Sequence, residues 1–256
     1  MQTLCNWQRC HNCFMMRLYN NKTSNNSNQD SRSMNDRISL KLSLQSYQRF
    51  EQLHQQFNSA HSQSLAQPLG AVLADISVEI IEQVFGEIAR ASTSDDQESE
   101  KVLQQILATL RKYMPWSVSL LGNERLTPMV NYLQQLIYTE HEQAYICYPV
   151  DHLLVLEFLE CIQQMQQGNT QYLSPALKAF IQVVDQGVSC LIRQPKKILK
   201  FNLVVDKTLS GVIQLTTQLG YKRLEKLAMQ DNPQTTQHYF EHFLRFLQRK
   251  PKSLAI

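Results

Sequence analysis

Residues 173–193 read LSPALKAFIQVVDQGVSCLIR, and this stretch carries the clearest structural signal in the chain. Ser174 followed by Pro175 predicts a helix start, with the serine as cap and the proline at the first helical position, where its missing N–H costs no hydrogen bond. Apolar residues then recur every three or four positions: Leu177, Phe180, Ile181, Val184, Val188 and Leu191. This spacing predicts one apolar helix face, and we expect the helix to continue until Pro195 breaks it.

The same helical periodicity occurs on both sides of this stretch. The other segments with an apolar stripe are about 71–91, 102–110 with an end at Pro115, 127–140, 154–162 with a close at Gly168, 206–219, 221–229 and 234–249. Because each amphipathic helix must cover its apolar face with another element, these stripes predict a helical bundle or array.

A few short runs are compatible with strands. Residues 38–44 alternate apolar and polar side chains, which favours an extended entry before a helix from Tyr47 to Phe57, although one continuous helix is the alternative. Residues 144–149, AYICYP, fit either a short buried strand or a connector. The runs 116–120 and 201–205 leave the same question open, because a short apolar run does not separate strand from buried helix.

The N-terminal segment differs from the rest in composition. Residues 19–36 have almost no large apolar side chains and cannot contribute to a core. We therefore expect a disordered N-terminal arm over 1–36 and a single helical domain over 37–256, all-α or nearly so, with at most a few short strands. Met34 opens a more protein-like segment, which raises the hypothesis that translation naturally starts there.

Composition narrows the function classes. The chain has 256 residues, 43% of them hydrophobic and 18% charged, with 31 glutamines. Its 7 glycines and 8 prolines argue against turn-rich β-sandwiches and Gly-rich phosphate-binding folds. No run approaches 18 consecutive apolar residues, and the N-terminus lacks the apolar core of a secretory signal. These features predict a cytoplasmic protein without a membrane span.

The charge is unevenly distributed. Residues 34–189 hold 9 basic and 17 acidic side chains, a net charge of −8, whereas residues 190–256 hold 12 and 4, a net charge of +8. Such separation can steer a partner or drive head-to-tail self-association. Since no catalytic motif has its required context, we expect a non-catalytic binding or regulatory protein that acts through protein–protein contacts and needs no cofactor.

A first alternative is a nucleic-acid-associated regulator that uses the basic C-terminal third. Several basic side chains on one face would bind phosphates and give a steep salt dependence. The candidate residues are Arg193, Lys196, Lys197, Lys200, Lys222, Arg223, Lys226, Arg245 and Arg249.

A second alternative is a helical metalloprotein or hydrolase. The string His238-Tyr-Phe-Glu-His242 places two histidines on one helix face, as zinc peptidases do, and the 140–160 region is rich in His, Glu and Cys. The candidate metal ligands are His141, His152, Glu157, Glu160, His238 and His242. Cys147 with His141 or His152 would be a candidate nucleophile–base pair. Near the N-terminus, Cys5, Cys10, His11 and Cys13 have the residue types of a zinc site.

Overall fold

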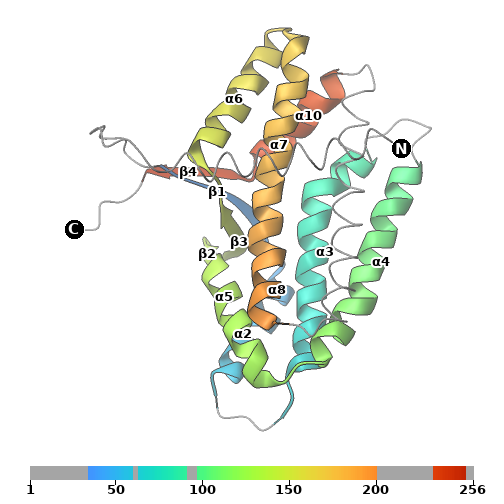
Figure 1. The fold of residues 1–256 in the computed structure, drawn as a ribbon, viewed down its shortest axis with the longest axis vertical. Helices are drawn as coiled ribbons and strands as arrows, with labels where there is room; N and C mark the ends of the chain where they lie inside the picture. The colour runs from blue at the N-terminus through green and yellow to red at the C-terminus, as the bar shows by residue number, and fades with distance from the viewer. Residues whose placement is uncertain (1–33, 60–62, 91–96, 201–232, 252–256) are drawn as a thin grey trace. The chain divides into compact units, whose positions relative to one another are not determined.

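The computed structural model describes residues 34–59, 63–90, 97–200 and 233–251 (Figure 1). Within these ranges the protein is mostly helical with one small sheet, which confirms the expected fold class. The proposed arm up to residue 33 with its cysteines and the helices expected at 206–219 and 221–229 lie outside the described residues. No helix in the described ranges is long and apolar enough to cross a membrane.

The elements follow one another closely along the chain. In order they are β1 (Met34–Lys41), α2 (Leu44–Phe57), α3 (Ala66–Arg90), α4 (Gln97–Ser119), α5 (Asn123–Leu136), β2 (Ile137–Glu140), β3 (Gln143–Pro149), α6 (His152–Gln166), the 3-10 turn η1 (Thr170–Tyr172), α7 (Leu173–Val188), the π-turn η2 (Ser189–Arg193), α8 (Gln194–Leu199), α10 (Pro233–Leu244) and β4 (Leu247–Pro251).

The sheet joins the two ends of the described chain. Its strand order is β2-β3-β1-β4 and every neighbouring pair is antiparallel, so the first strand lies between the third and the last. Ile38 of β1 pairs with Tyr148 of β3 on one side and Leu247 of β4 on the other. The extended segment favoured near residue 38 is confirmed as β1, and the run 144–149, for which strand and connector were both open, belongs to β3. Because β1 begins at Met34, residues 34–36 belong to the sheet rather than to the arm.

The two faces of the sheet have different chemistry. Ile38, Leu40, Ile146 and Tyr148 are buried on the face that meets the helices. On the other face, the Arg37 guanidinium lies 4.2 Å from the ring centroid of Tyr138, and both side chains donate hydrogen bonds to the Gln248 side-chain oxygen. Tyr138 also stacks on Tyr145 at 5.2 Å. This face is therefore covered by its own polar and aromatic side chains.

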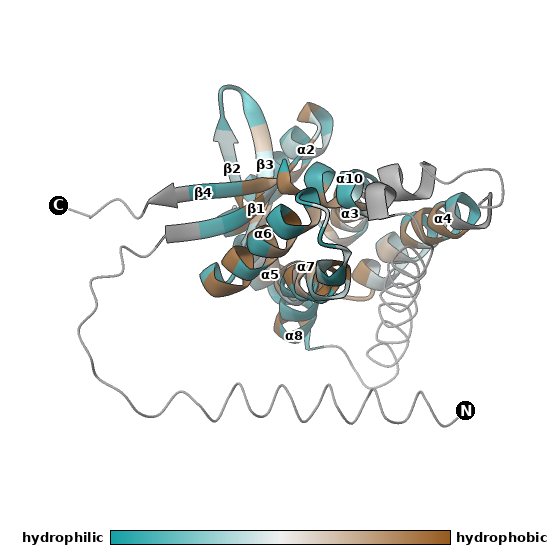
Figure 2. Ribbon diagram, turned by 90° about the horizontal axis from the view of Figure 1, so that it is seen from above, coloured by the Kyte–Doolittle hydropathy of each residue, from teal (hydrophilic) through white to brown (hydrophobic). Residues whose placement is uncertain are grey.

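Helices α6, α7 and α10 meet in an aromatic cluster around Phe180. The Phe180 side chain of α7 is fully buried, and its ring lies 4.7 Å from Phe243 and 5.3 Å from Tyr239 of α10, centroid to centroid. Phe158 of α6 and Phe240 of α10 lie at 5.8 and 5.5 Å. Figure 2 shows α6 and α7 with both hydrophobic and hydrophilic segments, as expected for helices buried on one side.

The expectation that Pro115 ends its helix is wrong. Helix α4 continues through Pro115 to Ser119, so residues 116–119 are helical as well and the run 116–120 is not a strand. Proline removes one hydrogen bond, to the carbonyl four residues earlier, and packing against a neighbouring helix can offset that loss. Here α3 and α4 pack closely: a Cβ atom on Gly70 of α3 would lie only 2.6 Å from the Pro115 Cα.

Two expectations about the stretch 173–195 also need correction. Helix α7 begins at Leu173, directly after η1, and no side chain caps it, so Ser174 is not its cap. Pro195 does not interrupt the helical course, because the π-turn η2 leads from α7 into α8, where Pro195 occupies the first turn. At that position no donor is needed from its nitrogen.

Two predicted helices end earlier than their periodicity indicates. Helix α5 stops at Leu136, and residues 137–140 form β2 instead; helix α10 stops at Leu244, and residues 247–251 form β4. Both strands exist because another strand is available beside them, β3 for the first and β1 for the second. A local pattern cannot detect a partner that is distant in the sequence.

We expect Gly70→Ala to destabilise the protein by about 1–3 kcal/mol, because the new methyl group overlaps the Pro115 backbone and the helices must separate. Helix propensity alone predicts the opposite sign, a gain of about 1 kcal/mol. Urea unfolding of the two proteins decides between them. A raised midpoint would show that α3 and α4 do not pack this closely.

Candidate functional site

Three large apolar side chains lie exposed at the C-terminal end of α4. Tyr113 and Trp116 belong to the helix and Leu120 directly follows its last residue; they are 46%, 52% and 50% exposed. Their spacing of i, i+3 and i+7 places them along one side of this end of the helix. We name this set the α4 stripe. The buried residues of the same helix, among them Leu103, Leu107 and Val118, face another side, so one helix cannot bury both sets against α3.

The surroundings of the α4 stripe are basic. Lys112 is exposed at its N-terminal end, where the ammonium lies 5.1 Å from the ring centroid of Tyr113, whereas Arg111 lies on the opposite side of the helix. Residues 101–120 contain no Asp or Glu. The stripe therefore combines aromatic and leucine side chains with positive charge.

A second exposed stripe of opposite charge lies on α6. Leu153 and Leu156 are 74% and 42% exposed, and Glu157 and Glu160 are exposed beside them. The spacing i, i+3, i+4 and i+7 places all four on one side of the helix, and we name them the α6 stripe. The opposite side of α6, which includes Phe158 and Ile162, is buried in the core.

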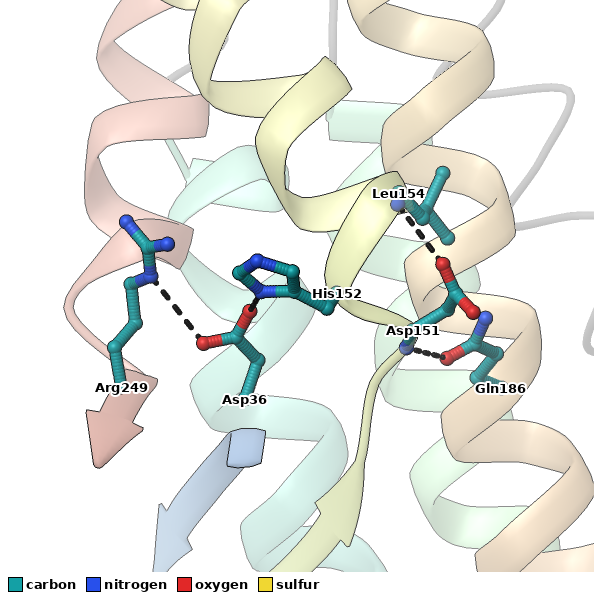
Figure 3. Close-up of polar contacts among 6 residues, drawn as sticks. All are labelled: Asp36, Asp151, His152, Leu154, Gln186 and Arg249. Carbon is teal, nitrogen blue, oxygen red and sulfur yellow. Dashed lines mark hydrogen bonds and ion pairs between the residues drawn. The ribbon is translucent and has the colours of Figure 1, made fainter. Parts of the chain in front are cut away.

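The start of α6 is held by a buried carboxylate (Figure 3). The Asp36 side chain of β1 has no exposed surface; one of its oxygens lies 2.6 Å from His152 Nδ1 and the other accepts a hydrogen bond from Arg249 Nε at 3.2 Å. Asp151 caps α6 by accepting from the Leu154 N–H. Asp36 therefore joins the first strand, the last strand and α6.

A shallow, open cleft lies between α2 and the start of α3. The described residues that line it are Arg49, Gln52, Leu53, Gln56, Gln63, Ser64, Leu65, Pro68 and Val72. Arg49, the charged member of this lining, is 2.6 Å from Asp75. The lining thus offers amide groups and an already paired arginine, but no acid–base pair.

The candidate phosphate-binding residues are divided between distant elements. Arg193 pairs with Asp185 at 2.8 Å and Arg249 pairs with Asp36. Lys196 and Lys197 lie in the last turn of α8, which packs against α5, whereas Arg245 follows α10. The Lys200 carbonyl accepts a hydrogen bond from Arg125. Lys222, Arg223 and Lys226 lie outside the described residues.

The candidate metal ligands lie on different elements, and some of them bind protein groups instead of a shared site. His141 lies exposed in the β2–β3 turn at a φ of 49°, and His152 binds Asp36. Glu157 and Glu160 point outward from α6. His242 Nε2 is 3.0 Å from the Gln83 carbonyl, and His238 is exposed. In the ranges that the structure describes, no three His, Cys, Asp or Glu side chains are grouped to hold a metal ion.

The residues of the proposed hydrolase also lie apart. Cys147 pairs in register with Ser39, so it lies on the sheet face opposite to Asp36 and therefore to the His152 contact. Burial raises the pKa of the Cys147 thiol, with the nearby Arg37 acting in the other direction. A protonated thiol is a weak nucleophile.

Hydrogen bonds from Gln237 and Gln166 lower the pKa of Glu241 in the His238–His242 string.

Comparison with protein-family models, with curated proteins and with solved structures found no significant match. The α4 stripe, the exposed leucines of α6 and Asp36 are not among the residues expected from the sequence. A signal for the α6 leucines was present. Residues 153–156 are four consecutive apolar residues, LLVL, and one helix face cannot bury them all.

Proposed function

We propose that the protein is a non-catalytic helical binding module that contacts a partner protein through the α4 stripe. The observation that carries the proposal is the half-exposed Trp116, with Tyr113 and Leu120 along the same side of one helix. Tryptophan and tyrosine are, with arginine, the residues enriched at the energetically important positions of protein interfaces. A set of anchors at i, i+3 and i+7 is also how a helix is recognised in an apolar groove.

The position of the stripe supports this proposal. Helix α4 is anchored to α3 by buried residues and by the close approach at Gly70, so its outward side is presented on a rigid element. Such preorganisation lowers the entropic cost of association. We assign the contact surface to α4 because the large apolar side chains of the α4 stripe are exposed to solvent. A cytoplasmic location, nucleic-acid binding and metal binding stay predictions.

Photo-crosslinking in the native host tests the proposal directly. A photoreactive residue at the exposed position Ser119, between Trp116 and Leu120, is expected to form discrete adducts with a partner protein. The same residue at exposed Gln171, in η1, is the control and is expected to form none of these adducts.

Adding Trp116→Ala to the Ser119 probe should remove the adducts, because losing an interface tryptophan weakens binding by about 2 kcal/mol or more, roughly a factor of 30. Circular dichroism and the urea midpoint show whether the variant remains folded. Adducts that persist at full strength in a folded Trp116→Ala protein would exclude the α4 stripe as the contact surface.

A further inference from the structure

The α4 and α6 stripes are complementary in charge and equal in length. Lys112 borders the α4 stripe and residues 101–120 hold no acidic side chain, whereas α6 holds Glu157 and Glu160 and neither Lys nor Arg. Each stripe spans seven residue steps, about 10 Å of helix. We infer that the α4 stripe of one copy docks on the α6 stripe of a second copy. This inference rests on the proposed function and names its partner.

The order of residues along each helix determines the orientation of the contact. On α4 the charge that borders the stripe, Lys112, precedes the apolar residues; on α6 the apolar residues precede Glu157 and Glu160. If the two helices run antiparallel, the basic end of one stripe meets the acidic end of the other. Trp116 and Leu120 then cover Leu156 and Leu153, which are exposed in the single copy. A parallel arrangement would place the charges against leucines and would cost desolvation.

The contact uses two different surfaces, so each copy in a pair retains one unused stripe. A heterologous contact of this kind builds rings or open chains rather than stopping at a symmetric dimer. Two short stripes form a small interface, so we expect association that is weak and strongly dependent on concentration. Because exposed charges contribute, added salt should weaken it.

The test measures the mass of the full chain and two single-stripe variants by sedimentation velocity, from about 1 µM to about 1 mM, a range that spans weak to moderate affinities. We expect the wild-type protein to grow beyond a dimer as its concentration rises. Trp116→Glu and Leu153→Lys should each be monomeric. An equimolar mixture of the two should form a 1:1 dimer and nothing larger, since one variant retains α6 and the other α4.

A charge reversal provides a second test that leaves every apolar residue in place. Lys112→Glu alone should weaken association about tenfold, and adding Glu157→Lys in the same chain should restore it. This pair keeps the inference testable if Trp116→Glu does not fold. Circular dichroism of each variant verifies the fold.

Three results would overturn the inference: a wild-type protein that stays monomeric at every concentration, a Leu153→Lys protein that associates like the wild type, or a mixture of the two variants that remains monomeric. A monomeric wild type that still gives adducts with another protein at Ser119 would overturn self-association and leave the proposed function intact. A monomeric wild type without adducts would overturn both.

Discussion

Replacing Phe180 with alanine should lower the free energy of unfolding by about 3–5 kcal/mol. The Phe180 side chain is fully buried, and its ring has four aromatic neighbours, Phe158, Tyr239, Phe240 and Phe243, with centroids between 4.7 and 5.8 Å. Alanine removes the buried ring and its edge-to-face contacts and leaves a cavity between α6, α7 and α10. Core packing of this kind relaxes only in part.

Urea unfolding followed by circular dichroism measures this effect. Leu153→Ala is the matched control: Leu153 is 74% exposed on the neighbouring helix α6, so its loss should change stability by no more than about 0.5 kcal/mol. If Phe180→Ala cost no more than this control, Phe180 would not be the centre of the core.

Removing both side-chain partners of Asp36 should lower the free energy of unfolding by as much as Phe180→Ala does. The double change His152→Ala with Arg249→Met should cost about 3–5 kcal/mol at neutral pH, because it leaves a carboxylate without exposed surface and without either hydrogen bond. Asp36→Asn should cost less, about 1–2 kcal/mol. Asparagine keeps one acceptor oxygen for Arg249, and its amide N–H can donate to His152 Nδ1 in the other neutral tautomer of the ring. The His152 and Arg249 side chains, 37% and 33% exposed, also have access to water.

The measurement compares urea unfolding of the double variant, Asp36→Asn and a triple variant that carries all three changes. The triple variant should recover much of the loss, since it has no buried charge to leave unpaired. Equal stability of the double and triple variants would mean that the charge of Asp36 is not what the two partners stabilise.

The location of Asp36 gives this contact a role in the fold. β1 and β4 are separated by about two hundred residues of sequence, and Asp36 joins both to the start of α6. The same turn of α6 begins the α6 stripe. Stability at Asp36 and presentation of Leu153 are therefore coupled through one helical turn, and the Asp36 variants should be checked for folding before any binding result is interpreted.

The exposed stripes show why the site was harder to predict than the fold. Leu107 and Trp116 are both large apolar residues of α4, and periodicity alone treats them alike. Leu107 is 1% exposed and Trp116 52% because α3 covers only one side of the helix. Which side is covered depends on where the neighbouring helix lies, and that information is not local to the sequence.

The sequence by itself determined the mostly helical class and the approximate positions of α3, α5, α6 and α7, and it favoured the extended segment of β1; it left β3 open between strand and connector. The reason is that period-3.6 and period-2 patterns are local properties of the chain. Tertiary structure alone decided that α4 continues through Pro115, that Pro195 begins a new helical turn, and that residues 247–251 pair with β1. It also decided which apolar residues remain in water. Each of these outcomes depends on a neighbour distant in the sequence, whose packing or hydrogen bonds outweigh the local preference.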